Sequence, residues 1–530
     1  MTDPNRIIAA IDIGTNSIHM VIVQVDASLP SFNVIATEKA TVRLGERCAK
    51  TGMLTDVAME RSLEALKRCQ EISQSLNVEE IIAVATSAVR EAPNGQDFIN
   101  KIEEKLELTV DLISGQEEAR RIYLGVLSAL ELNNQSHVII DIGGGSTELI
   151  LGNGHDPDYL SSTKVGAVRL SDLYITTDPI SDREFEKLQI YIRAMLERPT
   201  DEIKHHLVDE AKAGELVKLI GTSGSIEAVA MIHAKQTLGT IPEPLQGYEI
   251  TFADVENVVL QLRQMNLAQR TALAKEKRGE IILAGALILL EAMRLLNAPK
   301  LILCQRSLRE GLIVNWMIEK GLIADRLQYQ GSVRDRSVIK LAQKYGVDLD
   351  YGKQVARLAI SLFDQTQGIL HNWGDQERDL LKTAAILHNS GCYISHSSHH
   401  KHSYYLIRNG ELLGYTETQI EAIANLARYH RRSEPKKKHE NYRRLTNKHY
   451  RQFVEEINPL LRLAVALDRR QIGAVKDVKV TIDTKARQFI LEVIPTEPHD
   501  PCTLEMWNLD YKKDALESQY QLTVITHLQN

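Results

Sequence analysis

Two stretches of the chain share one arrangement of apolar and polar positions. An apolar run at residues 7–10 leads into Asp12-Ile-Gly-Thr-Asn-Ser17, and another at 138–140 leads into Asp141-Ile-Gly-Gly-Gly-Ser-Thr-Glu148. Each is followed by a further apolar run. A buried strand, a turn of glycine and hydroxyl residues and a second strand are typical of a β-hairpin. Two hairpins of the same chemistry predict a duplicated α/β domain.

Helical and strand patterns alternate around these hairpins. Between them, a helix, a strand, a helix and a strand are predicted at residues 56–76, 81–85, 98–106 and 110–113. After residue 150 come a strand at 218–220, a turn at 221–225 and a helix from Ile226. This alternation predicts sheets covered by helices. The stretch 279–296 is apolar on most faces, so we expect it to form a buried helix.

The pattern changes in the second part of the chain. Beyond about residue 325 helical periodicity dominates up to about 470, and two-residue alternation returns after 476. We therefore expect an α/β fold with a duplicated core, then an all-α domain and a small α/β tail. The expected parts are residues 1–127, 128–312, 313–475 and 476–530.

Composition narrows the class of protein. The 530 residues are 43% hydrophobic and 25% charged, which is ordinary for a globular protein. The five cysteines are scattered without a CxxC motif, which argues against a disulfide framework or a cysteine zinc site and favours a reducing cytosol. The polar start and the short apolar runs predict neither a signal peptide nor a membrane anchor. We expect a cytoplasmic protein.

Charge is unevenly distributed along the chain. Residues 1–330 carry 34 basic and 46 acidic residues, whereas residues 331–530 carry 29 basic and 24 acidic ones. Chance variation is one interpretation. The other is that the C-terminal part meets a polyanion.

The two glycine turns are candidate anion sites. Backbone N–H groups around a concavity bind anions, and glycine lets the backbone approach the oxygen atoms closely. The chain has no GxxxxGK[ST] motif and no GxGxxG between a strand and a helix, which excludes a P-loop and a dinucleotide fingerprint. The candidate phosphate-binding residues are Gly14, Thr15, Asn16, Ser17, Gly143, Gly144, Gly145 and Ser146.

These turns resemble the two phosphate loops of the superfamily of sugar kinases, actin and heat-shock chaperones. Four further strings, in the expected order within residues 7 to about 312, resemble its exopolyphosphatase/guanosine pentaphosphate phosphohydrolase branch. They are Ala85-Thr-Ser-Ala-Val-Arg90, Ile113-Ser-Gly-Gln-Glu-Glu-Ala-Arg120, Gly221-Thr-Ser-Gly-Ser225 and Ser307-Leu-Arg-Glu-Gly311. The resemblance implies an actin-like (ribonuclease H-like) core with its active cleft between two halves.

A pair of glutamates is the candidate source of a general base. The spacing of Ser114 and Glu117 predicts a capping box at the start of a helix over residues 115–130, which leaves Glu118 free. A carboxylate at that position can accept a proton from a water molecule behind a terminal phosphorus atom. The resemblance places the family's catalytic glutamate on Glu118.

Further charged residues fit phosphoanhydride chemistry, which depends on positioning and charge neutralisation. Mg²⁺ is usually held by one or two carboxylates with phosphates and waters, so Asp141 and Glu148 are candidate metal ligands. Asp12 is a third candidate, with turn capping as its alternative role. The resemblance places Arg90 and Arg278 near the phosphate chain, where a guanidinium binds oxyanions in bidentate fashion. A surface salt bridge is the alternative for Arg278.

The predicted helical domain is rich in histidine, with eight of the 17 histidines between residues 388 and 449. It resembles the helical domain of the longer exopolyphosphatases, which is similar to metal-dependent phosphohydrolases named for a His-Asp pair. Here Asn389 replaces that aspartate, and a neutral amide bridges metals poorly, although Asp468 remains in a plausible final position. We expect a degenerate domain without a second active metal centre, its histidines being ordinary core and surface residues.

A basic segment follows within this domain. Residues 428–444 contain eight Lys or Arg residues against two Glu. Such a segment can be a solvated loop, a nonspecific nucleic-acid patch or a binding track for long polyphosphate, whose affinity would fall with salt. The candidate track residues are Arg431, Arg432, Lys436, Lys437 and Lys438.

Together these features predict an Mg²⁺-dependent exopolyphosphatase that processively removes terminal phosphate from inorganic polyphosphate. The alternative is a guanosine pentaphosphate 5′-phosphohydrolase, acting on guanosine penta- or tetraphosphate. A kinase of the wider superfamily and a non-catalytic sensor of polyphosphate or alarmone are less favoured. We expect neither membrane nor specific nucleic-acid binding, and the family suggests a homodimer.

Overall fold

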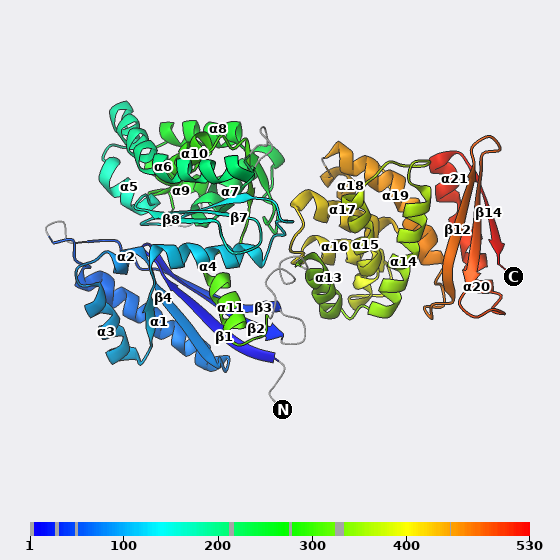
Figure 1. Cartoon of the computed structure of the whole chain (residues 1–530), viewed down its shortest axis with the longest axis horizontal. Coiled ribbons are helices and arrows are strands. Elements are labelled where there is room, and N and C mark those ends of the chain that lie inside the picture. The colour runs from blue at the N-terminus through cyan, green and yellow to red at the C-terminus, as the bar shows by residue number, and fades with distance from the viewer. Residues whose placement is uncertain are drawn as a thin grey trace. The chain divides into compact units, whose positions relative to one another are not determined.

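The computed structural model describes residues 5–26, 31–47, 51–210, 217–274, 278–323, 333–445 and 447–529. The chain divides into two compact units, Met1–Val333 and Arg334–Asn530, which are described separately (Figure 1). The finer four-part division stays a prediction. No described helix has the length and hydrophobicity needed to cross a bilayer.

The first sheet of unit 1 is built around the first predicted hairpin. β1 (Asn5–Ile13) pairs antiparallel with β2 (Ser17–Asp26), and β2 with β3 (Ser31–Thr41). β4 (Glu80–Ala85) and β5 (Val110–Leu112) extend the sheet in parallel from β1, which gives the order β3-β2-β1-β4-β5. The helices α1 (Asp56–Ser75) and α3 (Gly95–Leu106) share one hydrophobic core with this sheet.

The second sheet repeats this topology. β6 (His137–Ile142) and β7 (Thr147–Gly152) form the second hairpin, with β8 (Tyr159–Thr163) antiparallel to β7. β9 (Leu219–Thr222) and β11 (Lys300–Leu303) follow in parallel, and β10 (Glu249–Thr251) pairs with β11. The order β8-β7-β6-β9-β11 therefore matches β3-β2-β1-β4-β5 strand for strand, which confirms the predicted duplication.

Helices pack on the second sheet and enclose its core. Every residue of α10 (Ile282–Leu295) from Ile282 to Met293 is buried, so the predicted buried helix is confirmed. The other helices of this half are α5 (Ala167–Tyr174), α6 (Asp182–Glu210), α7 (Gly224–Leu238), α8 (Phe252–Gln264) and α9 (Leu267–Ala274).

After β11 the chain returns to the first half. Helix α11 (Leu308–Glu319) contacts β1 and packs on α4 (Gly115–Leu127). A Cβ atom at Gly311 would lie 1.7 Å from the carbonyl oxygen of Arg121, and one at Gly125 would lie 2.0 Å from that of Ser307. Glycine at both positions therefore allows the close approach that places the second half of α4 beside the start of α11.

Unit 2 begins with the predicted helical domain and ends in the predicted α/β tail. Its helices are α13 (Val333–Lys344), α14 (Leu349–Thr366), α15 (Asp375–Leu387), the 3₁₀ turn η1 (Ser390–Tyr393), α16 (His399–Arg408), α17 (Glu417–Tyr429), α18 (Glu440–Arg444) and α19 (Lys448–Ala466). The tail contains β12 (Val475–Asp483), β13 (Gln488–Pro495), α20 (Thr503–Lys512), α21 (Asp514–Tyr520) and β14 (Thr523–Leu528).

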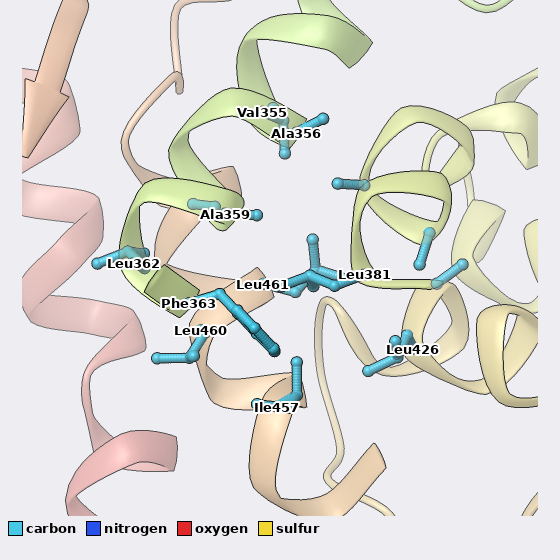
Figure 2. Close-up of a cluster of buried hydrophobic side chains, with 14 of the residues drawn as sticks. Val355, Ala356, Ala359, Leu362, Phe363, Leu381, Leu426, Ile457, Leu460 and Leu461 are labelled. Carbon is cyan, nitrogen blue, oxygen red and sulfur yellow. The ribbon is translucent and has the colours of Figure 1, made fainter. Parts of the chain in front are cut away.

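One hydrophobic core joins both parts of unit 2. Figure 2 shows Phe363 and Leu362 of α14 close to Ile457, Leu460 and Leu461 of α19. The same core includes Val478, Phe489 and Leu491 of the three-stranded sheet. Shared burial of this kind stabilises the tail against the helices, because the apolar face of the small sheet is removed from water there.

Candidate active site

The two glycine turns have the same local geometry. The amide of Gly14 donates to the carbonyl oxygen of Ser17 at 3.1 Å, and the amide of Gly143 donates to that of Ser146 at 2.9 Å. Asp12 stands opposite His19 in the first hairpin, as Asp141 stands opposite Glu148 in the second. The duplicated fold therefore presents two equivalent turns, each preceded by an aspartate.

The two turns meet in space. A Cβ atom at Gly145 would lie 2.8 Å from Thr15 Oγ1 and 2.5 Å from Ser87 Oγ. A Cβ atom at Gly144 would lie 2.9 Å from the Cβ of Thr15. Larger residues in the second turn would therefore collide with the first one, which explains the need for glycine at these positions.

A cleft of about 820 Å³ lies between the two halves of unit 1. Of the residues named from sequence, those that line it are Asp12, Gly14, Thr15, Asn16, Ser17, Glu118, Asp141, Gly143, Gly144, Gly145, Ser146 and Arg278. Arg278 packs against Gly224 at this surface, which favours its cleft position over a surface salt bridge. Arg90 and Glu148 lie next to the lining residues.

Helix α4 differs from the prediction in the partners of Glu117 and in its last residue. Ser114 Oγ accepts from the amide of Glu117 at 3.1 Å, as expected for an N-cap. The Glu117 carboxylate instead binds Arg120 and Arg121, at 2.7 Å each, so the predicted reciprocal bond of a capping box is replaced. Two guanidinium groups are stronger partners than one amide. The helix ends at Leu127 rather than at residue 130.

Glu118 is held in the cleft by Arg90. Arg90 Nη1 donates to Glu118 Oε2 at 2.9 Å and to the carbonyl oxygen of Ile113 at 2.9 Å. Arg90 ends the helical turn α2 (Ser87–Arg90). Burial raises the pKa of the Glu118 carboxyl, and the charge of Arg90 partly opposes this rise.

Three more carboxyl groups lie around Glu118. Burial and the Glu118 charge raise the pKa of Asp12 to about 7; burial, again with a contribution from Glu118, raises that of Asp141 to about 7. Glu148 is fully buried, accepts from Ser162 Oγ at 2.7 Å and has a pKa raised well above its usual range by burial, Glu118 and Asp141. Clustered carboxylates share protons unless a cation neutralises them.

The carboxylate cluster suits a hard divalent cation. Asp12 Oδ1 is buried and has no hydrogen-bond partner among the described residues, whereas Asp141 accepts from Ser307 Oγ. Mg²⁺ binds carboxylate oxygens and retains several waters, which matches an open cleft with an unpartnered oxygen. The donor set therefore fits Mg²⁺.

Basic residues also line the cleft, and sequence reasoning assigned only Arg278 among them to the site. Burial, together with the charges of Arg309, Lys39 and Arg278, lowers the pKa of His19 to about 3. All four residues line the cleft. Arg309 lies within the string Ser307-Leu-Arg-Glu-Gly311, so its position in that motif was the available signal.

The candidate track residues and the histidine-rich segment predicted from the sequence belong to unit 2. Arg431 Nη1 lies 3.1 Å from His399 Nδ1, the carbonyl oxygen of Arg432 accepts from Arg462 Nη2 at 2.8 Å, and Lys436, Lys437 and Lys438 are exposed. His388 is buried, with Nδ1 2.7 Å from the carbonyl oxygen of Ala385, and burial lowers its pKa to about 4. This environment is that of a satisfied core histidine.

The duplicated actin-like core and a cleft lined by glycine turns, carboxylates and cations are typical of enzymes that act on phosphate groups. Two family models match the chain: the Ppx/GppA phosphatase family over residues 21–320, and domain III of the Ppx/GppA phosphatases over residues 333–513. The chain belongs to the Ppx/GppA phosphatase family.

The chain is also similar to individual proteins and solved structures. A guanosine-5′-triphosphate,3′-diphosphate pyrophosphatase of Pseudoalteromonas atlantica is 29% identical over 433 residues, which cover 81% of this chain and 80% of the relative. An exopolyphosphatase from Cytophaga hutchinsonii, known from its crystal structure, is 27% identical to this chain. The match covers 60% of this chain and 98% of that protein, with a TM-score of 0.54. The Ppx/GppA family member of Aquifex aeolicus is 24% identical, covers 60% of this chain and 99% of its own, and has a TM-score of 0.49.

Proposed function

We propose that this protein is an exopolyphosphatase that releases orthophosphate from the end of inorganic polyphosphate. The observation that carries the proposal is the position of Glu118, which Arg90 holds in a cleft bordered by two facing glycine turns. That arrangement places a carboxylate beside two sets of amide donors, as an in-line attack of water on a bound terminal phosphate requires.

In the proposed reaction, the amides of the two turns and the Ser146 hydroxyl bind oxygens of the terminal phosphate. Glu118 accepts a proton from the attacking water as its oxygen bonds to phosphorus. The bond between that phosphorus and the bridging oxygen then breaks, and the bridging oxygen leaves with its electron pair on the shortened chain. Because burial raises the pKa of Glu118, its carboxylate is a stronger base than an exposed one.

Mg²⁺ is the proposed cofactor, with Asp12, Asp141 and Glu148 as the residues that would hold it. Bound there, Mg²⁺ would neutralise negative charge on the phosphate oxygens. Arg90 and Arg278, together with the newly found Arg309, supply further positive charge on the protein side. These residues orient the phosphate chain and stabilise its oxygens in the transition state.

A guanosine pentaphosphate 5′-phosphohydrolase is the second candidate function. The relative from Pseudoalteromonas atlantica carries a guanosine-phosphate name, whereas the one from Cytophaga hutchinsonii is called an exopolyphosphatase. The basic segment favours the polymer, because Arg431, Arg432 and the lysines at 436–438 place five positive charges within eight residues, which a long polyanion can bind. We propose this segment as a polyphosphate track.

The test is phosphate release from long-chain polyphosphate and from guanosine pentaphosphate, measured side by side with the wild type and Glu118→Gln. We expect faster release from polyphosphate and a loss of about 10²–10⁴-fold in kcat for the variant, with polyphosphate binding retained. Glu117→Gln is the matched control, because this neighbour binds Arg120 and Arg121 outside the cleft. Unchanged turnover in Glu118→Gln would refute the catalytic assignment, and transfer of phosphate to a sugar or ADP would indicate a kinase.

A further inference from the structure

The loop between α15 and α16 places a thiol and two imidazoles together in unit 2. Gly391 in η1 packs directly on α16, since a Cβ atom there would lie 2.1 Å from the carbonyl oxygen of His399. Ser403 Oγ accepts from the Gly391 amide at 2.9 Å and donates to the carbonyl oxygen of His388 at 2.7 Å. The backbone next to Cys392 is therefore fixed against the first turn of α16.

This packing brings three metal-ligating side chains together. The ligand atoms of Cys392, His396 and His399 all lie within 4.8 Å of one another. Cys392 and His396 are exposed, whereas His399 is buried. The spacing Cys-x₃-His-x₂-His contains a single cysteine, so a search for CxxC motifs does not find it.

Hydrogen bonds indicate which nitrogen of His399 carries a lone pair. His430 Nδ1 lies 2.7 Å from the carbonyl oxygen of Ala427, to which it can only donate, so His430 Nε2 carries a lone pair. His399 Nε2 lies 3.2 Å from His430 Nε2 and must donate to it. With one proton on each ring, His399 Nδ1 then carries a lone pair and cannot donate to the carbonyl oxygen of His396, which lies 3.1 Å from it.

Arg431 supports the same protonation state. Its Nη1 lies 3.1 Å from His399 Nδ1, and a guanidinium can only donate a hydrogen bond. A lone pair on Nδ1, with the other ring nitrogen bonded to a buried partner, is the arrangement in which metal-binding histidines are held. His399 is thus oriented as a ligand, and the cation beside it in this structure is a side chain.

We propose that Cys392, His396 and His399 form a site for one Zn²⁺ ion, which competes with Arg431 for the lone pair of His399 Nδ1. A thiolate and two imidazoles are ligands that Zn²⁺ prefers over Mg²⁺, with water in the fourth position. Bond lengths of about 2.0–2.3 Å require the three ligand atoms to move closer together. The exposed side chains of Cys392 and His396 have the freedom to do so.

Local charge makes the competition with Arg431 testable. Arg432 and Arg469 act on Arg431 electrostatically, so the surroundings are basic, and a Zn²⁺-bound Cys392 thiolate would supply the negative charge that offsets them. Removing the positive charge of Arg431 should therefore tighten Zn²⁺ binding, by about fivefold for one unit charge at short range. Removing the thiolate should weaken it by at least about 10-fold.

The experiment uses the full chain, stripped of transition metals and kept in excess Mg²⁺ so that the carboxylate cluster of unit 1 is saturated. Zn²⁺ affinity is measured by competition with a chromophoric chelator, and Co²⁺ is added separately as a spectroscopic probe. We expect one Zn²⁺ per chain and a thiolate-to-Co²⁺ charge-transfer band. Because no activity is measured, the result is independent of the proposed function.

Variants distinguish this site from adventitious binding. Because Cys392 is exposed, Cys392→Ser should abolish the Co²⁺ band without unfolding the chain. Arg431→Gln should tighten Zn²⁺ binding. His499→Gln, an exposed histidine of the same unit, is the matched control and should leave the affinity unchanged. The absence of a Co²⁺ band in the wild type, or equal Zn²⁺ affinity in wild type and Cys392→Ser, would overturn the proposal.

Discussion

Arg90 donates a hydrogen bond of 2.9 Å to the carboxylate of Glu118 and thereby connects the end of α2 to the first turn of α4. The same nitrogen also donates to the carbonyl oxygen of Ile113. The guanidinium is therefore oriented by the backbone that precedes α4, and it orients the carboxylate in turn. For Glu118 as the proposed base, this contact fixes the position of the carboxylate.

Replacement of Arg90 should change both the rate and its pH dependence. In Arg90→Gln, loss of the positive charge raises the pKa of Glu118 further, because Arg90 is the group that lowers it. The acidic limb of the kcat profile should therefore move to higher pH, with a loss of about 10–100-fold at neutral pH.

Arg90→Lys is the control for charge, since it retains the cation without the planar guanidinium. It should keep the acidic limb nearer that of the wild type than Arg90→Gln does. Initial rates of phosphate release between pH 5 and 9 measure both effects. Identical acidic limbs of the kcat profile in wild type and Arg90→Gln would show that protonation of Glu118 does not cause the pH dependence of kcat.

Asp12 should make the stability of unit 1 depend on pH and on Mg²⁺. Its pKa is raised to about 7 in the folded chain, so its contribution to stability is complete below pH 4 and is lost as pH rises through 7. Asp12→Asn removes this loss. In the presence of a chelator, the free energy of unfolding of the variant should rise by about 1–3 kcal/mol relative to that of the wild type as the pH increases from 5 to 8.

Hydrogen exchange of peptides from β1 and β6, corrected for intrinsic rates, measures this difference within unit 1 alone. Added Mg²⁺ should stabilise the wild type at pH 8 more than Asp12→Asn, because it binds the ionised carboxylates. A pH-independent difference between the two proteins would contradict the raised pKa. Equal responses to Mg²⁺ would argue against Asp12 as a ligand.

Gly145 should tolerate alanine much less than Gly143 does, although both belong to the same turn. A Cβ atom at Gly145 would meet Ser87 Oγ at 2.5 Å and Thr15 Oγ1 at 2.8 Å, whereas at Gly143 it meets Ser146 O at 3.2 Å. Gly145→Ala should push the two turns apart and reduce kcat/KM by about 10²-fold, the cost of a misplacement near 1 Å. Gly143→Ala should cause a smaller loss. Steady-state kinetics compare them, and equal losses would exclude steric conflict as the cause.

The basic segment should affect long substrates selectively. With Lys436, Lys437 and Lys438 changed to Gln, we expect KM for long-chain polyphosphate to rise several-fold and its salt dependence to weaken, because fewer charges meet the polymer. KM for guanosine pentaphosphate should change little, since that substrate is short. Steady-state kinetics at two salt concentrations provide the measurement. A parallel change for both substrates would remove the track from the proposal.

Local patterns predicted most of the core of the site. The hairpins around Gly14 and Gly143 follow from alternating apolar strands and glycine turns, which short-range interactions determine. The N-cap at Ser114 was predicted for the same reason. The reciprocal bond of Glu117 was not formed, because two arginines one turn further along the helix outcompeted the backbone amide.

By itself, the sequence determined the duplication, the elements of both halves and the presence of Asp12, Glu118 and Asp141 at the ends of predicted elements, since periodicity and turn chemistry are local properties. The tertiary structure alone decided that Arg90 binds Glu118, that Thr15 meets Gly145, and that His19 and Arg309 face the carboxylates. These pairs lie up to hundreds of residues apart, and packing of two sheets and their helices brings them together. Such distances depend on tertiary packing, and the pKa shifts of these residues depend on burial. No local sequence pattern encodes either.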